Sequence, residues 1–420
     1  MTRWILLLIT VLCGYAAISS AEPLTLESCL QRVREQNPTL LEAASAPRLA
    51  AAAEQEALNA YRPRVALTAG YTQQQAPQQV VISGKTAPTQ DQGYAHASIG
   101  VDQLLYDFGR TSGRAGAAGA TRRSAGFFYS STEQNILLQT AAVYYRVLNA
   151  KILLQAAQDE VNQTMAHLRS AQALYDHGMV TRNDLLQAEV RLASSRQLVM
   201  ARTGEEENAW LTLNYLIERP VESRGELIAE PIIADEPGAE TVPVDERPDL
   251  LAQTERVSAA RESLNQDRGE FWPELFAHLG ADYVDNSYVQ EQTIYSATLG
   301  LRFTLYDGAT RDVQLHQALE TLHREQQHLI DLQKQARLAA LTARNDAHVA
   351  KQQIAVAQTA IRQAEENLRI NQDRYKEQVG TATDVLDAQT MLTQARTALA
   401  QAQFDYQVAI ARLRYATGSL

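Results

Sequence analysis

Residues 295–307 read YSATLGLRFTLYD, and from Tyr295 to Leu305 every odd position is apolar while the positions between are small or polar. A period of two residues is the pattern of a β-strand with two different faces. The stretch from Leu275 to Tyr283 alternates in the same way shortly before it. The sequence therefore predicts a β-hairpin over residues 274–306.

A second pair of alternating stretches, 65–71 and 95–101, predicts another hairpin over residues 64–106. Alternation over about ten residues is typical of transmembrane β-strands. A soluble sheet is the alternative, but the polar face carries ionisable groups and no other segment supplies the second layer that a soluble sheet needs. Four strands cannot close a barrel, and lipid does not tolerate open strand edges. The membrane interpretation therefore predicts an oligomer.

The rest of the chain favours long helices. No proline occurs between Pro88 and Pro220 or after Pro273, and proline interrupts helix interiors. A helix over about 112–176 would be roughly 100 Å long at 1.5 Å per residue. Near the C-terminus, apolar residues recur at alternating spacings of three and four, which is typical of coiled-coil packing. This seam comprises Val385, Ala388, Leu392, Ala395, Leu399, Ala402, Tyr406, Ala409 and Leu413.

The chain is internally duplicated. Leu105-Tyr106-Asp107 matches Leu305-Tyr306-Asp307 at an offset of 200, and the segment that begins at Asn37-Pro38 matches the one at Arg247-Pro248 at an offset of 210. Self-similarity of this kind predicts repeated structure. We expect one repeat over residues 22–217 and another over 247–420, joined by an acidic, proline-containing linker or strap over 218–246. Helix-turn-helix tips are expected near 175–184 and 375–384.

The N-terminus has the features of a secretory signal over residues 1–21. Arg3 precedes an apolar run, and small residues follow it up to Ala21. Cys13 follows Leu12, where lipoprotein processing requires a small residue, so lipidation is not expected. Cys29 is then the single cysteine of the mature chain, and we expect it to be buried without a disulfide.

Composition and motifs argue against several classes of function. The 49 acidic residues outnumber the 38 basic ones, which argues against a nucleic-acid partner. The eight histidines are scattered without the spacing of a helical metal pair, and neither a phosphate-binding loop nor a nucleophile motif occurs. We therefore expect no catalysis, no metal site and no cofactor.

Several motifs occur in one order and partly in duplicate. They are Leu24-Thr25-Leu26-Glu27-Ser28-Cys29-Leu30, the two Leu-Tyr-Asp motifs, Asp384-Val385-Leu386-Asp387-Ala388-Gln389 and Tyr415-Ala416-Thr417-Gly418. In these the chain resembles the TolC family of outer-membrane efflux and type I secretion channels over nearly all of its mature length. The resemblance implies a mostly α fold with some β. In a homotrimer, antiparallel coiled-coil helices would form a periplasmic α-barrel, and two hairpins per chain would give four strands to a shared 12-stranded outer-membrane β-barrel.

The resemblance also implies a function. The trimer would lie in the outer-membrane lipid with a large periplasmic portion, as a passive exit duct for substrates delivered by an inner-membrane pump of the RND or ABC type and a periplasmic adaptor (a membrane fusion protein). Tripartite efflux of small molecules is the first expectation, and type I protein secretion is the alternative. A periplasmic coiled-coil adaptor or scaffold is a further alternative, but it does not explain the four strands.

The family's gate positions fall at the expected tips. Asp384 and Asp387 match its acidic constriction, and Asp184 and Tyr375 match a pair that links neighbouring coils. Since positions i and i+3 share a helix face, a trimer would present rings of carboxylates that filter ions by sign. The alternative is that the aspartates only cap helices.

The family's adaptor docks at the same tips. Val379-Gly380-Thr381 fits its docking turn, and Gly178 takes part in the corresponding turn of the first repeat. Gly178 follows Tyr175 by three residues, whereas Gly380 follows Tyr375 by five, so we expect the two turns to differ in shape. No basic residue stands at the position that pairs across the closed gate in some members, which argues against a tightly latched gate.

Overall fold

The structure is a computed structural model that describes residues 24–228 and 244–418. The expected signal at 1–21 and residues 229–243 of the expected linker lie outside the described residues. The chain divides into two compact units. We call the unit of Met1–Asn37, Gln139–Glu236 and Ala347–Val408 the coil unit, and the unit of Pro38–Leu138, Pro237–Asp346 and Ala409–Leu420 the strand unit.

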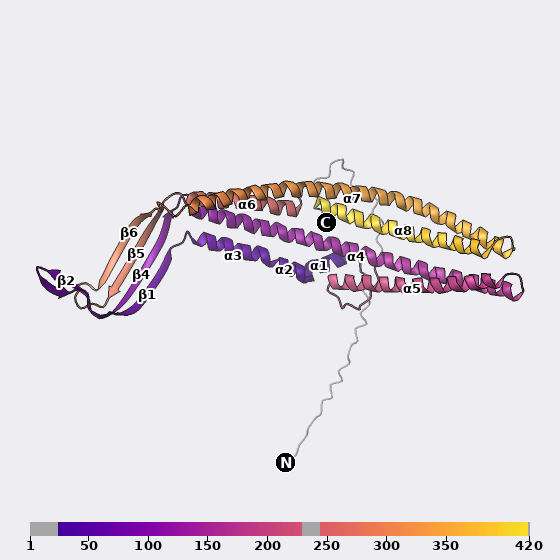
Figure 1. The fold of residues 1–420 in the computed structure, drawn as a ribbon, viewed down its shortest axis with the longest axis horizontal. Helices are drawn as coiled ribbons and strands as arrows, with labels where there is room; N and C mark the ends of the chain where they lie inside the picture. The colour runs from indigo at the N-terminus through magenta and orange to yellow at the C-terminus, as the bar shows by residue number, and fades with distance from the viewer. Residues whose placement is uncertain (1–23, 229–243, 419–420) are drawn as a thin grey trace, which may run out of the picture. The chain divides into compact units, whose positions relative to one another are not determined.

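Helices make up most of the described chain. Their bounds are α1 Leu26–Gln36, α2 Pro38–Ala43, α3 Ser45–Asn59, α4 Arg110–Asp176, α5 Arg182–Leu216, α6 Pro248–Gly269, α7 Thr310–Lys376 and α8 Ala382–Thr417. The helices α4 and α7 have 67 residues each and begin 200 positions apart. The helices α5 and α8 also begin 200 positions apart. The internal duplication is thereby confirmed. Figure 1 shows α4 running beside α5 and α7 beside α8. None of the described helices is long and apolar enough to cross a membrane.

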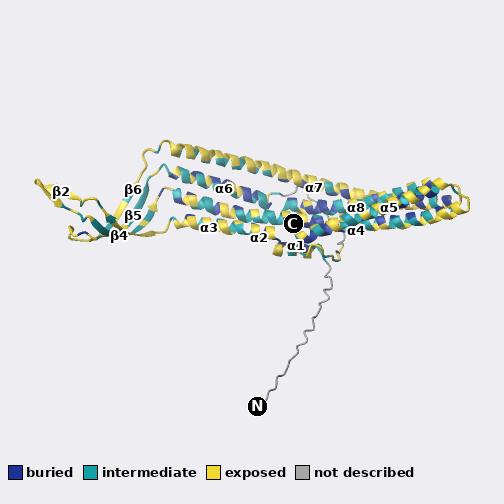
Figure 2. Ribbon diagram, turned by 60° about the horizontal axis from the view of Figure 1, so that its bottom comes forward, coloured by how far each residue is buried: buried dark blue, intermediate teal, exposed yellow. Residues whose placement is uncertain are grey.

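The core of the coil unit lies between paired helices. Val385, Ala388 and Leu392 of α8 are buried in one cluster with Ala364 and Leu368 of α7. Alanine at alternate layers lets the two helix backbones approach closely. The seam predicted from the sequence is thus confirmed, although Ala395 and Leu399 are only half-buried. Figure 2 shows the buried residues concentrated on the helices.

The chain entry and the start of the linker are fastened to the coil unit. Leu24 forms a parallel bridge with Leu227. The Tyr144 hydroxyl of α4 lies within hydrogen-bond distance of the carbonyl oxygens of Leu24 (3.0 Å) and Ile228 (2.6 Å). Cys29 on α1 is fully buried, and burial raises the pKa of its thiol to about 11. This cysteine is therefore a packing residue.

The strand unit contains a four-stranded antiparallel sheet of order β1-β4-β5-β6. Its strands are β1 Arg64–Gln73, β4 Gly93–Tyr106, β5 Glu274–Val284 and β6 Thr293–Arg302. The two predicted hairpins therefore join into one sheet through β4 and β5, which pair with each other. None of the residues of these four strands is fully buried.

The longer loop of the first hairpin contains a small hairpin that the sequence reasoning missed. Strands β2 Gln79–Ile82 and β3 Lys85–Pro88 pair around Ser83 and Gly84, whose φ angles are 49° and 76°. Two consecutive residues with positive φ make the turn type that suits a two-residue hairpin loop. The ten extra residues of the first repeat therefore form ordered structure.

The last predicted strand ends earlier than expected. The alternation of apolar residues continues to Leu305, but β6 ends at Arg302, which pairs with Glu274. Pro273 precedes Glu274 and lacks an N–H, so β5 offers no further ladder partner beyond this point. The predicted boundary at 306 was wrong because the alternation of apolar residues in β6 does not indicate where its partner β5 begins.

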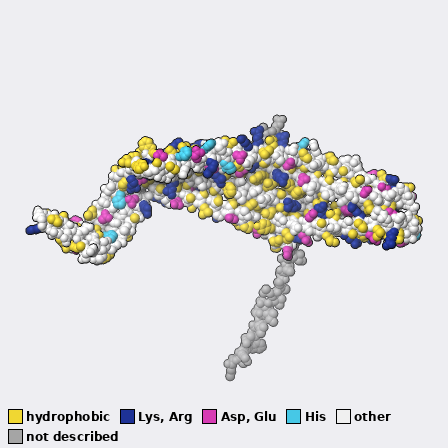
Figure 3. Space-filling model, in the orientation of Figure 1, with side chains coloured by type: hydrophobic (Ala, Val, Ile, Leu, Met, Phe, Trp, Pro, Cys, Tyr) yellow, Lys and Arg dark blue, Asp and Glu magenta, His cyan; other side chains and the backbone are white. Residues whose placement is uncertain are grey.

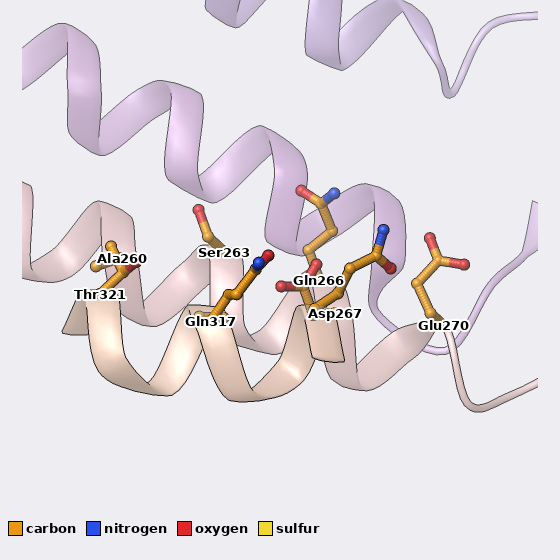
Figure 4. Close-up of a pocket in the computed structure, with 9 residues that line it drawn as sticks. Ala260, Ser263, Gln266, Asp267, Glu270, Gln317 and Thr321 are labelled. Atoms are coloured by element: carbon orange, nitrogen blue, oxygen red, sulfur yellow. The ribbon is translucent and has the colours of Figure 1, made fainter. Parts of the chain in front are cut away.

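A polar hollow of about 330 Å³ lies between α6 and α7 in the strand unit (Figure 4). Carboxylates, amides and hydroxyls from the two helices line it, and burial raises the pKa of Asp267. The lining residues are Ala260, Ser263, Gln266, Asp267, Glu270, Gln314, Gln317, Ala318 and Thr321. Within the described residues no group of three or more His, Cys, Asp or Glu side chains could hold a metal ion. The hollow contains none of the residues predicted as functional.

Candidate functional site at the helix tips

The first tip joins α4 to α5 in the coil unit. The Met179 N–H donates to the Leu174 carbonyl (2.8 Å), and the Gly178 N–H donates to the Tyr175 carbonyl (2.8 Å). This pair of bonds is the Schellman motif, which satisfies carbonyls left over at a helix C-terminus and requires a residue with positive φ. Gly178 takes that position with a φ of 70°.

The second tip has the same backbone geometry. The Val379 N–H donates to the Arg374 carbonyl (2.9 Å), and the Gln378 N–H donates to the Tyr375 carbonyl (3.1 Å). Gln378 takes the left-handed position with a φ of 61°. The expectation that the two turns differ in shape was therefore wrong. Gln378 thus has the left-handed conformation that Gly178 has at the first tip. Gly380 does not have a positive φ, so it is not the residue that bends the chain.

The two tips lie next to each other. The Gln378 side-chain amide is 3.0 Å from the Met179 sulfur, which joins the second tip to the first. Within the coil unit this contact brings both predicted docking segments to one place.

Asp184 and Asp384 cap the helices that leave the tips. The Thr181 N–H donates to the Asp184 carboxylate (2.9 Å), and the Asp184 N–H donates to the Thr181 hydroxyl (3.3 Å). Thr381 and Asp384 form the same pair of bonds at 2.9 and 3.2 Å. Hydrogen bonds that the Asp384 carboxylate accepts from Thr381, first from the backbone N–H and then from the side chain, hold the pKa of this carboxyl below its ordinary value. The capping interpretation is thus correct for both residues, and it does not exclude a second role.

Asp387 makes no such cap. It lies one turn further along α8 and is exposed. Together with the half-buried Asp384 it places two carboxylates on one face of the first turns of α8. Their predicted role in an acidic constriction stays a prediction.

Tyr375 is buried at the tip, whereas its counterpart Tyr175 is exposed. Its ring centroid lies 5.3 Å from that of His167 on α4. Burial raises the pKa of the Tyr375 hydroxyl, and the negative charge of Asp184 raises it further. Asp184 thus lies close enough to act on Tyr375 electrostatically and to favour the neutral phenol. The Tyr375 hydroxyl is buried without a hydrogen-bond partner among the described residues, so the link between neighbouring coils that the resemblance implied stays a prediction.

The predicted docking residues are accessible. Val379 is 66% exposed, and Gly178 and Thr381 are exposed as well. A Cβ at Gly380 would lie only 3.1 Å from the Cβ of Arg374. Gly380 therefore lets the turn pack closely against the end of α7, whereas Gly178 adopts its positive φ without the strain that a side chain brings.

Sequence reasoning missed several buried polar residues of the coil unit, including His167 and Gln389. His167 is buried under Tyr375, and burial lowers the pKa of its imidazole. Gln389 of α8 is fully buried, and neither atom of its amide has a hydrogen-bond partner among the described residues. Gln389 ends the motif that begins at Asp384, but only its position on the packed face of α8 could have indicated that it is buried. His167 gave no signal at all.

The model of a family described as "Outer membrane efflux protein" matches residues 29–217 and 244–419. The chain belongs to the outer membrane efflux protein family. Among curated members, "Outer membrane efflux protein BepC" of Brucella suis is 25% identical over 98% of this chain and 88% of its own length. "Alkaline protease secretion protein AprF" of Pseudomonas aeruginosa is 23% identical over 77% of this chain and 69% of its own length.

Solved structures support the fold of this efflux protein family member. The outer membrane protein VceC from Vibrio cholerae superimposes with a TM-score of 0.84 over 94% of this chain and 96% of its own chain, at 16% identity. The resemblance and the fold class stated from the sequence are therefore confirmed.

The buried His167 leads to a prediction about pH. Because its pKa is lowered in the folded state, the unfolded chain binds more protons once the pH falls below the ordinary imidazole value of about 6.5. Stability should therefore be full above this value and should decrease as the pH falls toward the folded-state pKa. We expect the thermal midpoint of the detergent-solubilised protein to decrease between pH 7.5 and 5.5.

His167→Gln should show a smaller decrease over the same interval, because the amide has no charge to gain. His177→Gln, at an exposed position of the first tip, is the matched control and should behave like the unmodified protein. Equal pH dependence in the His167 and His177 variants would contradict this assignment.

Proposed function

We propose that three copies of this chain form an outer-membrane duct through which substrates leave, delivered by an inner-membrane pump and a periplasmic adaptor. Tripartite efflux of small molecules is the favoured use. Membership of the efflux protein family supports the general function. The assembly and the location are inferred from the sheet and the tips.

The observation that carries the proposal is a sheet whose apolar face is uncovered. The register aligns Leu67, Ile99, Ala281 and Tyr295 in one row across the four strands. Large apolar side chains at odd-numbered positions, on the same face as this row, are exposed on all four strands, and Tyr295 is 81% exposed. They are Val65, Leu67, Tyr71, Ile99, Leu279, Tyr283, Tyr295, Leu299 and Leu301. A contiguous apolar surface of this size needs a cover, and lipid is the cover that fits alternating strands.

The edges of the sheet require further chains. In the described structure β1 and β6 each pair on one side only. Unpaired N–H and C=O groups are too costly in lipid, so each edge must find a strand. Pairing of β1 with β6 of the next copy would close a twelve-stranded sheet from three copies. This argues for a homotrimer and against a scaffold that stays in the periplasm.

Protein secretion is the second candidate. It is favoured by the relative AprF, whose name says that it serves alkaline protease secretion. A duct for either cargo needs the same sheet and the same tips, since the pump upstream chooses the cargo. The partner pump, of the RND or ABC type, would therefore distinguish the two uses.

Fractionation of cells that produce the full chain tests the proposal. We expect the protein in the outer-membrane fraction as a trimer that dissociates on heating. Recovery from the soluble or inner-membrane fraction, or as a monomer in mild detergent, would reject the duct. The inner-membrane pump that co-purifies after crosslinking then decides between efflux and secretion.

The carboxylates at the start of α8 should control ion passage. In planar bilayers we expect Asp384→Ala combined with Asp387→Ala to raise conductance and weaken cation preference, because a ring of negative charge is removed. Exposed Asp373→Ala, on α7, is the control for loss of a nearby charge. Unchanged selectivity in the double variant would leave both residues without a gating role.

The tight turn at Gly380 should be needed for adaptor docking. We expect Gly380→Leu to abolish export, because its Cβ would press against Arg374 and displace the exposed Val379. Trimers should still assemble, since the change is confined to the turn. Resistance of cells to a pump substrate measures export, and heat-sensitive mobility measures assembly. Gly204→Ala, at an open position in α5, is the control. Normal export by the Gly380 variant would remove the docking role.

A further inference from the structure

The polar face of the four-stranded sheet carries a histidine held by a carboxylate. The His278 Nδ1 on β5 lies 2.7 Å from the Asp102 Oδ1 on β4. The register places these two residues directly opposite each other, with Arg64 of β1 and Thr298 of β6 in the same row. The row therefore alternates a fixed cation, a carboxylate and an imidazole. Figure 3 shows histidine and charged side chains interspersed over this sheet.

The imidazole of His278 lies flat against the wall of the sheet. A Cβ at Gly100 would be 2.9 Å from its Cε1, and a Cβ at Gly280 would be 3.1 Å from its Nε2. Two glycines in neighbouring strands thus make room for the ring. Since Asp102 holds one nitrogen and the glycines accommodate the ring, His278 has a fixed position on the polar face.

The other charged groups on this face are either paired already or lie in other rows of the sheet. Glu274 accepts hydrogen bonds from Arg302 (2.7 Å) and Arg110 (3.1 Å), so its charge is compensated. Asp282 lies two rows from His278 on the same strand and face. The other histidine, His96, lies over Gly70 and has no carboxylate opposite it in the register. His278 is therefore the titratable group with a direct charged partner in the middle of this face.

We propose, resting on the duct inferred above, that His278 and Asp102 make the ion selectivity of the sheet region depend on pH. Imidazole is the side chain that ordinarily changes its charge between pH 5 and 8. A neutral His278 leaves the Asp102 charge facing the duct. A protonated His278 cancels that charge, and three copies would change the charge of the wall by three.

The location separates this effect from that of the tips. The residues of the row belong to the strand unit, whereas Asp384 and Asp387 belong to the coil unit. Carboxylates ordinarily stay ionised above pH 5.5, so selectivity that changes between pH 7.5 and 5.5 reports on histidine. The two filters can therefore be varied independently.

The test is the reversal potential of single channels in planar bilayers under a KCl gradient at pH 7.5 and 5.5. For the unmodified protein we expect the ratio of cation to anion permeability to fall by about sixfold at pH 5.5. One unit charge about 8 Å from a permeant ion in water changes cation passage by about 2.4-fold and anion passage by the same factor in the opposite direction. In His278→Gln the ratio should be the same at both pH values. The glutamine side chain can still donate to Asp102 but cannot gain a proton.

Two controls identify the residue. His323→Gln, at an exposed position of α7 outside the sheet, should retain the full pH dependence. His96→Gln tests the other histidine of the polar face and should also retain it. Channels whose selectivity is the same at both pH values, or a pH dependence that survives in His278→Gln, would overturn the inference while leaving the duct intact. Absence of any channel would instead count against the proposed function.

Discussion

Every backbone N–H and C=O that leaves water needs a hydrogen-bond partner, and this constraint governs the strand unit. The sheet satisfies it internally between β1 and β4, β4 and β5, and β5 and β6, but leaves one side of β1 and one of β6 open within the described chain. The apolar face of the sheet also needs a cover, because no described helix of the strand unit buries it. Both demands would be met by the same proposed arrangement, a ring of identical chains in lipid.

The two helical pairs of the coil unit meet a different constraint, which is register. Between α4 and α5, buried Glu160 binds Arg191 (2.9 Å), and Thr164 shares a hydrogen bond with Ser195 (3.0 Å). Positions 360, 364 and 395, at an offset of 200, are alanine. Polar contacts in a coil fix its register at some cost in stability, whereas alanine layers pack closely without fixing it. At these layers the duplicated coils have therefore diverged, because the first is held by buried polar pairing and the second by close packing of alanine.

Much of this fold was predictable because its signals are periodic. Proline-free stretches, the seam from Val385 to Leu413 and the offset of 200 predicted α4, α5, α7 and α8, and alternation predicted the strands. What could not be predicted depends on contacts between distant residues. The end of β6 is set by Pro273 on the partner strand, and the burial of His167 by Tyr375 on another helix. The shape of the second turn depends on Gln378 accepting a left-handed conformation that sequence statistics assign to glycine.

The tips show how the duplication separates shape from chemistry. Both turns share the Schellman pair of hydrogen bonds and both following helices have the same Thr–Asp cap, so the backbone is closely similar in the two repeats. The side chains are not: Gly178 and Met179 occupy the positions of Gln378 and Val379. A partner that recognised only the backbone would bind both tips of a chain equally. Since the Gln378 amide contacts the Met179 sulfur, the two tips present one joint surface with different chemistry on each side. A partner that distinguishes the tips must therefore contact these side chains, and such contacts would give a pseudo-symmetric chain a defined orientation toward the proposed adaptor.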